Sequence, residues 1–265
     1  MTTKPEVTIQ GSDFTLPPSP QRQAIVLMFG NAGEGKTTAG LTHAPSPVAF
    51  FDIDQRGLYA AQKAQAAGQV IHYTSIPYPA DITKMTDAVA KTTAQASWDK
   101  FRKNYEIAVR ESQNGNIRTI VIDTATELDE LITIAIKGRI DKKNDDYGRS
   151  DAIIKAGLGQ TIKMSREGRA NLLMLARAKS LWDSGGKFAH RGHDTLKYDA
   201  DLAGHIRLGT PIGRQRPKFE LEVTKAGIDI QQFGQVYKED DWDELGPFVY
   251  MCLMNYPGSK VRDWR

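Results

Sequence analysis

The feature that most constrains the fold is a glycine-rich segment with the spacing G-x-x-x-x-G-K-T, which runs from Gly30 to Thr37. The continuous apolar run 24–29 before it is typical of a strand buried on both faces. Ala39 and Leu41 after it indicate a short helix that ends at Pro45. A strand, a glycine loop and a helix N-terminus together form a hollow of N–H groups that binds phosphate. These flanks favour a nucleotide site over a glycine-rich turn that matches by chance.

The chemistry of the loop predicts ATP and Mg²⁺ as its ligands. The Lys36 ammonium would reach the β- and γ-phosphates, and the Thr37 hydroxyl would ligate Mg²⁺. The residues expected to contact the nucleotide are Gly30, Asn31, Ala32, Gly33, Glu34, Gly35, Lys36, Thr37 and Thr38.

A second Mg²⁺ ligand is expected at the end of another parallel strand, because such a site needs an acidic group beside the phosphate loop. Asp123 follows three consecutive β-branched residues, 120–122, and fits this role. It could instead cap the next helix, although Thr124 is better placed to do so.

Hydrolysis also needs a group that orients water. Asp52 and Asp54 end the apolar run that follows the loop helix, and alternation along a strand places both on one side. We expect Asp54 to be the catalytic acid. The alternative is that one or both aspartates cap the turn 55–57.

Two cations follow the predicted strand 171–176. Arg177 and Lys179 are separated by one residue and would face the same way if the strand continued. They would sense the γ-phosphate or touch DNA, or they are solvated charges at a strand end.

The order of predicted elements indicates an α/β fold with a mostly parallel sheet flanked by helices and with antiparallel C-terminal strands. Strands are expected at 24–29, 48–53, 70–76, 118–123 and 171–176. Helices are expected at 57–67, within 81–113, after Thr124 and at 150–167, and Thr124 with Glu127 forms a capping-box pattern. The last third carries strand-like runs at 204–208, 218–224 and 248–254, expected as antiparallel additions to one edge. We divide the chain into an N-terminal arm (1–23), an ATPase core (24–232) and a C-terminal β-rich and acidic extension (233–265).

Composition adds limits on location and partners. The 265 residues have a formal charge of +3, which permits an anionic partner without requiring one. The single cysteine, Cys252, cannot form an intramolecular disulfide, and this is typical of a reducing compartment. No secretory signal and no apolar run of about 18 residues is found, so we expect a cytoplasmic protein without a membrane segment.

These motifs, in this order, resemble the RecA-like recombination ATPases over most of the chain from about 24 to 230. The segment 30–38 matches the phosphate loop of that family, and the segment 49–54 is similar to its strand that ends in the catalytic acid. That acid is typically glutamate in the family, so Asp54 is one methylene shorter. The resemblance implies ATP hydrolysis that is stimulated by DNA, in a homo-oligomer that forms a filament or a ring.

The resemblance also implies roles for two cations. The segments 195–198, 205–209 and 222–225 are similar in order and spacing to the stretch after the second DNA-binding loop of the family. A lysine near Lys225 reaches the nucleotide of the neighbouring subunit in that family. At the position of Arg177 the family more often has a glutamine that couples nucleotide to DNA.

More narrowly, the short chain and the segment 145–149 resemble the compact phage nucleotide-binding proteins of the Sak single-strand-annealing group. This resemblance implies a phage-encoded protein that acts in the cytoplasm of the host. It also implies cooperation with a single-stranded-DNA-binding protein.

Two segments combine cations with glycines or aromatic rings and are candidate contacts for single-stranded DNA, although each could be a surface loop without that role. The first spans 137–149, where acidic residues offset part of the charge, and the second spans 180–198 and includes Trp182. The candidate DNA-binding residues are Lys142, Lys143, Arg149, Lys179, Lys187, Phe188, Arg191 and Lys197.

The sequence therefore predicts an ATP-dependent protein that binds single-stranded DNA and promotes strand annealing or pairing in recombination. Its catalytic candidates are Lys36, Asp54, Arg177 and, for the neighbouring subunit, Lys225. Two alternatives remain open. One is a nucleotide-gated DNA-binding module with negligible hydrolysis, and the other is a small-molecule kinase on the same core.

Overall fold

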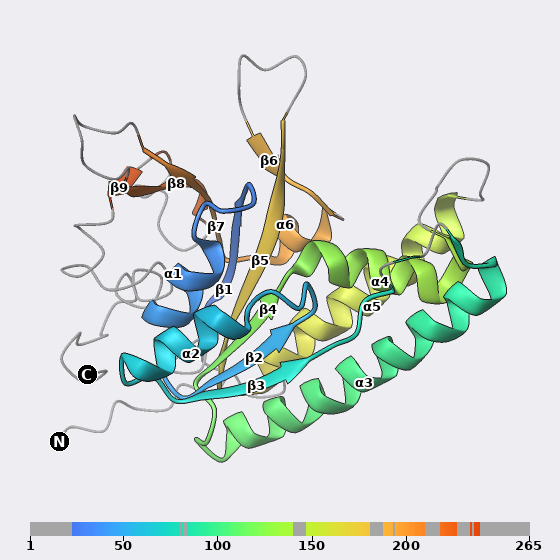
Figure 1. The fold of residues 1–265 in the computed structure, drawn as a ribbon, viewed down its shortest axis with the longest axis horizontal. Helices are drawn as coiled ribbons and strands as arrows, with labels where there is room; N and C mark the ends of the chain where they lie inside the picture. Colours follow the sequence, from blue (N-terminus) through green and yellow to red (C-terminus); the bar gives the residue numbers. More distant parts are fainter. Residues whose placement is uncertain are drawn as a thin grey trace, which may run out of the picture.

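The computed structural model of the chain describes residues 23–79, 81, 84–139, 147–180, 188–192, 194–209, 218–226, 234 and 236–238 (Figure 1). The strands are β1 (Ile25–Gly30), β2 (Val48–Asp52), β3 (Ile71–Ser75), β4 (Thr119–Asp123), β5 (Asn171–Ser180), β6 (Phe188–His190), β7 (Leu202–Leu208), β8 (Phe219–Ala226) and β9 (Val236–Lys238). The helices are α1 (Lys36–His43), α2 (Leu58–Ala66), α3 (Asp87–Gln113), α4 (Ala125–Lys137), α5 (Tyr147–Glu167) and α6 (Thr195–Asp199).

The described strands form one sheet in the order β3-β2-β4-β5-β1-β7-β8-β9, and β6 pairs with β5. Neighbours from β3 to β7 are parallel, whereas β8, β9 and β6 pair antiparallel with their neighbours. The α/β class, mostly parallel with antiparallel C-terminal strands, is therefore confirmed. Parallel strands present their carboxyl ends at one edge, which is where open α/β sheets bind ligands.

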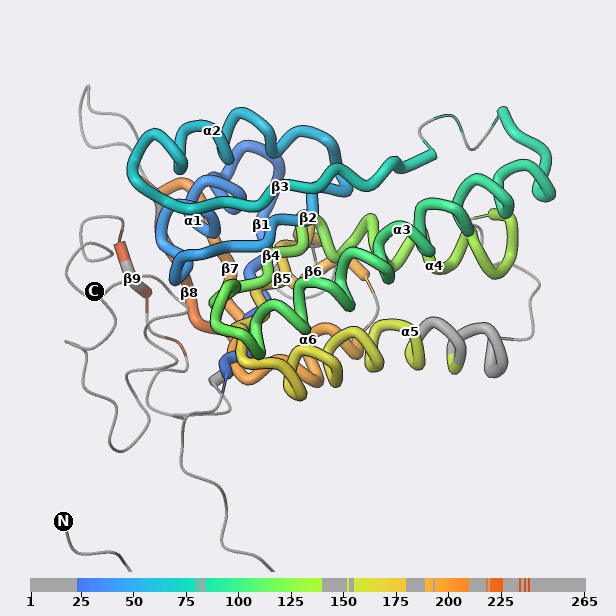
Figure 2. The backbone as a smooth tube through the Cα atoms, turned by 90° about the horizontal axis from the view of Figure 1, so that it is seen from below, coloured from blue at the N-terminus to red at the C-terminus, as the bar shows by residue number. Residues whose placement is uncertain are grey.

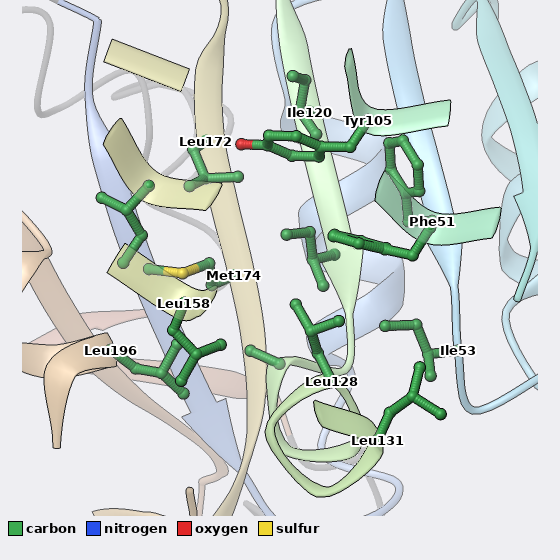
Figure 3. Packing of buried hydrophobic residues seen from close by; sticks show 14 of the residues in the cluster. Phe51, Ile53, Tyr105, Ile120, Leu128, Leu131, Leu158, Leu172, Met174 and Leu196 are labelled. Atoms are coloured by element: carbon green, nitrogen blue, oxygen red, sulfur yellow. The ribbon is translucent and has the colours of Figure 1, made fainter. Parts of the chain in front are cut away.

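Helices cover both faces of the sheet (Figure 2), and this is why strands β1, β2 and β4 are buried at every position and are mostly apolar. On one face, α1 and α2 pack against alternate residues such as Val26 and Phe50. On the other face, α3, α4, α5 and α6 bury the opposite set, including Phe51 and Ile120 (Figure 3). Tyr105 is buried in this second layer, and its hydroxyl donates to the Thr161 carbonyl at 2.8 Å.

Several boundaries differ from the sequence-based expectation, and each has a structural cause. Strand β5 continues to Ser180 because β6 pairs with its extension, from Ala178 opposite His190 to Ser180 opposite Phe188. Strand β7 was expected to be antiparallel, but it is parallel to β1 because the chain returns through α6 and enters beside Ile25. The expected second loop therefore contains β6 and α6.

Some expectations lie outside the described residues. These are the arm apart from Gln23, the strand expected at 248–254 and most of the segment 233–265. Within the described part of the chain, no helix combines the length and apolarity needed to cross a membrane.

Candidate nucleotide-binding site

The glycine-rich loop connects β1 to α1 at the centre of the sheet, because β1 lies between β5 and β7. Gly33 and Gly35 have φ angles of 82° and 80°, which favour glycine. A Cβ atom at Gly30 would clash with the backbone oxygen of Ile206 on β7. The glycines are therefore required both for the turn and for the close contact with β7.

The N-terminus of α1 is built to accept an anion. Its N-cap is Gly35, which has no side chain to accept a bond from the first-turn N–H groups. Lys36 is buried, and its ammonium donates to the carbonyls of Gly30 at 2.9 Å and Asn31 at 2.7 Å. Burial lowers the pKa of Lys36, while the nearby Asp123 carboxylate opposes this. The loop thus combines orphan N–H donors with a desolvated cation, as phosphate binding requires.

Thr37 and Asp123 meet as the sequence predicts for a Mg²⁺ site. The Thr37 hydroxyl donates to Asp123 Oδ2 at 2.6 Å, which joins α1 to the end of β4. Burial raises the pKa of Asp123 to about 6, although the hydrogen bond from Thr37 lowers it. A buried carboxylate beside a hydroxyl supplies the oxygen ligands that Mg²⁺ prefers. These two residues therefore fit the ion.

The two aspartates at the end of β2 have different environments. Asp52 is fully buried and accepts hydrogen bonds from the Gly57 N–H at 3.0 Å and the Tyr73 hydroxyl at 2.9 Å. Asp54 follows the end of β2, and its carboxylate lies 3.6 Å from Arg56 Nε and 3.6 Å from Arg177 Nη2. Asp52 thus stabilises the β2–α2 turn, and Asp54 is the carboxylate that retains access to solvent at this edge.

Arg177 lies beside the glycine-rich loop, since its backbone pairs with Gly30 in the register of β5 and β1. Its guanidinium forms ion pairs with Glu127 on α4 and with Asp54. The sequence pattern had suggested only a capping role for Glu127. Burial raises the pKa of Glu127 to about 7, in spite of the ion pair with Arg177.

The N-terminal part of α4 also binds the β5–β6 hairpin. The Thr126 hydroxyl accepts from the Arg177 N–H at 2.9 Å and donates to the Arg191 carbonyl at 2.8 Å. One turn later, Glu130 forms an ion pair with Arg191 at 3.2 Å. The nucleotide edge and the hairpin are therefore connected through side chains of one helix.

Lys225 lies away from the glycine-rich loop of its own chain. On β8 it pairs with Ala203, near the start of β7. The part of β7 that lies beside the end of β1 is further along the strand, where His205 pairs with Phe29. Its ammonium donates to the carbonyls of Lys197, Tyr198 and Ala200 at 2.8, 2.6 and 2.5 Å. Lys225 thus caps the C-terminus of α6 from the opposite edge of the sheet.

The structure describes part of the candidate DNA-binding set. Lys179 is exposed on β5, and Arg191 is exposed but paired with Glu130. Lys197 is half-buried on α6, where the neighbouring Tyr198 is 82% exposed. Lys142, Lys143 and Lys187 lie outside the described residues, as do the side chains of Arg149 and Phe188.

The chain is similar to the proteins of one known family and to a solved structure. A family model described as an AAA domain matches residues 22–208. Among solved structures, the RadB recombinase is similar, with a TM-score of 0.48 at 12% identity, covering 82% of this chain and 86% of that chain. No curated protein sequence matches the chain.

Proposed function

The chain belongs to the AAA domain family, and from this premise we propose that it is an Mg²⁺-dependent ATPase of RecA type that binds single-stranded DNA. One observation carries the proposal. Along the carboxyl edge of four adjacent strands, Asp54 follows β2, Asp123 ends β4, Arg177 lies on β5 and the glycine-rich loop follows β1. Each group has the chemistry that one step of phosphoryl transfer to water needs.

The roles of the residues follow from their contacts. Lys36 and the N–H groups at the start of α1 bind the phosphates, and Thr37 with Asp123 holds Mg²⁺, which neutralises phosphate charge when bound. Asp54 orients the attacking water, because it is the partly exposed carboxylate next to that pair. Arg177 stabilises negative charge on the γ-phosphate.

The DNA-binding part of the proposal is supported by the β5–β6 hairpin and α6. Lys179 and Lys197 supply cations for phosphates, and the exposed Tyr198 ring can stack on a base. The α4 side chains that contact both Arg177 and Arg191 give a route by which nucleotide could alter DNA affinity.

We further propose that the protein works as a homo-oligomer and promotes strand annealing in recombination. Lys225 supports a head-to-tail arrangement, since its edge of the sheet would face the nucleotide edge of a neighbour. To reach that nucleotide, its ammonium would have to leave the carbonyls that cap α6. Under this proposal the protein is encoded by a phage, and it acts with a single-stranded-DNA-binding protein in the host cytoplasm.

Fluorescence anisotropy of labelled single- and double-stranded DNA, with and without ATP and Mg²⁺, tests this function. We expect single-stranded DNA to bind at least about tenfold more tightly with ATP, and a salt series to show a slope that counts phosphate contacts. Lys36→Ala should abolish the ATP effect. Equal affinity with and without ATP, together with unchanged ATP turnover on DNA addition, would remove the basis for the DNA-dependent activity.

A second candidate function is a nucleotide-gated DNA-binding module with negligible hydrolysis. It is favoured by one observation, namely that Asp54 forms ion pairs with both Arg56 and Arg177. Steady-state phosphate release separates the two, because the gated module would bind DNA in response to ATP without turning it over.

A further inference from the structure

Glu127 is a buried carboxylate whose position is not explained by helix capping. In a capping box its side chain would accept a bond from the N–H of Thr124. Only half of that exchange is present, with the Glu127 N–H donating to the Thr124 hydroxyl at 3.2 Å. The Glu127 residue is 2% exposed, and its carboxylate oxygens accept no hydrogen bond within the described part of the chain. The carboxylate instead contacts Arg177 on β5.

Such a placement is costly, because a buried carboxylate is tolerated only when it is well paired. The charged groups that act on Glu127 are Arg177, Asp54, Glu130 and, from α1, Lys36, and Arg177 is the cation in direct contact with it. The burial cost raises the pKa of Glu127, and the two other acids oppose ionisation further. A glutamate at this position therefore needs Arg177.

Arg177 is shared between two carboxylates that differ in exposure. The same nitrogen, Nη2, contacts Glu127 and lies 3.6 Å from Asp54 Oδ1. The Glu127 side chain is 3% exposed, whereas that of Asp54 is 25% exposed. The contact of Arg177 with Glu127 is thus the closer of the two and the less exposed to solvent, and its contact with Asp54 is the weaker one.

We propose that Glu127 is a positioning residue that anchors Arg177 beside the glycine-rich loop and leaves Asp54 as its exchangeable partner. When a triphosphate binds, Arg177 stays on Glu127 and exchanges the Asp54 carboxylate for a phosphate oxygen. Asp54 is then released to orient water. This inference rests on the ATPase function proposed above, and it adds a residue on α4 to that site.

The test is a double-mutant cycle with Glu127→Gln, Arg177→Gln and the double variant in the full chain. Calorimetry with Mg²⁺ gives the dissociation constants of ATP and ADP, and phosphate release gives kcat and KM. Glu167→Gln is the matched control, since Glu167 is an exposed helical glutamate on α5 that pairs with Lys163 and not with Arg177.

We expect E127Q to reduce the preference for ATP over ADP by about fivefold and kcat by about tenfold, as loss of a charge-assisted contact predicts. R177Q should have at least the same effects, and E127Q should add nothing in the R177Q background. The control E167Q should retain the wild-type preference for ATP and the wild-type kcat.

The inference is overturned if E127Q retains wild-type values or has the same effect with and without Arg177. A wild-type protein that binds neither nucleotide would instead defeat the proposed function itself. If the wild type binds ATP but does not hydrolyse it, the ratio of the ATP and ADP dissociation constants still tests the inference. Should E127Q fail to fold, Glu127→Asp, which keeps a shorter carboxylate, is expected to give an intermediate preference for ATP, and wild-type values would contradict the anchor.

Discussion

Lys36 and Lys225 form the same kind of contact at opposite edges of the sheet. Each ammonium donates to backbone carbonyls, and burial lowers the pKa of each. The acceptors of Lys36 belong to its own loop, whereas those of Lys225 lie at the C-terminal end of α6 and at its cap, more than twenty residues away in sequence. We infer that Lys36 can exchange its carbonyls for phosphate at little structural cost, while Lys225 holds two elements together.

The surrounding charges show the same contrast. At the carboxyl edge, Asp123 and Glu127 are buried acids whose pKa values are raised to about 6 and about 7. At the amino edge, the negative charge of Asp201 is compensated, because its carboxylate accepts a hydrogen bond from the Ile25 N–H at 2.9 Å and forms an ion pair with Arg166. The carboxyl edge thus keeps charges that a ligand would stabilise, as is common at functional sites.

The largest expected effect is that of Lys36→Ala on nucleotide binding. Removing the ammonium should weaken ATP binding about 100-fold or more, because a buried charged contact to phosphate is lost. The midpoint of thermal unfolding should change little, since the hydrogen bonds that Lys36 donates to described residues stay within its loop. Calorimetry and thermal melts measure both, with the exposed Lys63→Ala as control. Unfolding at a much lower temperature would show that Lys36 is structural, like Lys225.

Glu127 should make stability depend on pH. Its pKa is raised to about 7 in the folded protein from 4.5, so the folded state binds its proton more tightly than the unfolded state does. Its contribution therefore favours folding at low pH and is lost as pH rises from about 4.5 to 7. In denaturant titrations without nucleotide, the free energy of unfolding of Glu127→Gln minus that of the wild type should increase by about 2 kcal/mol as pH rises from about 5 to about 8. A constant difference across that range would contradict the raised pKa.

Lys225→Met should lower stability rather than nucleotide affinity. Three carbonyls would lose a charged donor, which predicts a loss of about 1.5 kcal/mol in the free energy of unfolding. Urea titration measures this, and the exposed Lys163→Met is the matched control. An unchanged free energy of unfolding would mean that the α6 cap is dispensable.

The smallest effect is expected between Lys225 and Arg166. Arg166 donates to the Asp199 carbonyl at 2.9 Å, so both cations hold the end of α6. Arg166→Met and Lys225→Met should couple by about 0.5 to 1 kcal/mol in a double-mutant cycle, because they share one element. Strict additivity would show that the two cations act independently at this edge.

Much of the nucleotide edge was predictable because its signals are local. The spacing of the loop, the apolar runs and the acids after them follow directly from the sequence, and the Thr37–Asp123 contact confirms that the strand ends meet. The parallel direction of β7 was not predictable from its pattern, since an apolar strand looks the same in either direction.

The sequence also did not predict which distant residues some side chains contact. The capping-box spacing at Thr124 and Glu127 predicts a local bond, and a tertiary contact with Arg177 replaced it. Likewise, the family resemblance pointed to Lys225 as a lysine that reaches a neighbour's nucleotide, whereas within the chain its ammonium contacts three carbonyls at the C-terminal end of α6. In both cases the deciding partner is distant in the sequence, so local spacing carries no signal for it.

The most direct test of the account is the rate of phosphate release from ATP with Mg²⁺ by the wild type and by Asp54→Asn. We predict measurable turnover by the wild type and a kcat at least about tenfold lower for D54N at similar KM, because Asp54 would orient water without binding the nucleotide. Equal rates in the two proteins, or no release by a wild type that binds ATP, would contradict the claim that this edge of the sheet hydrolyses ATP.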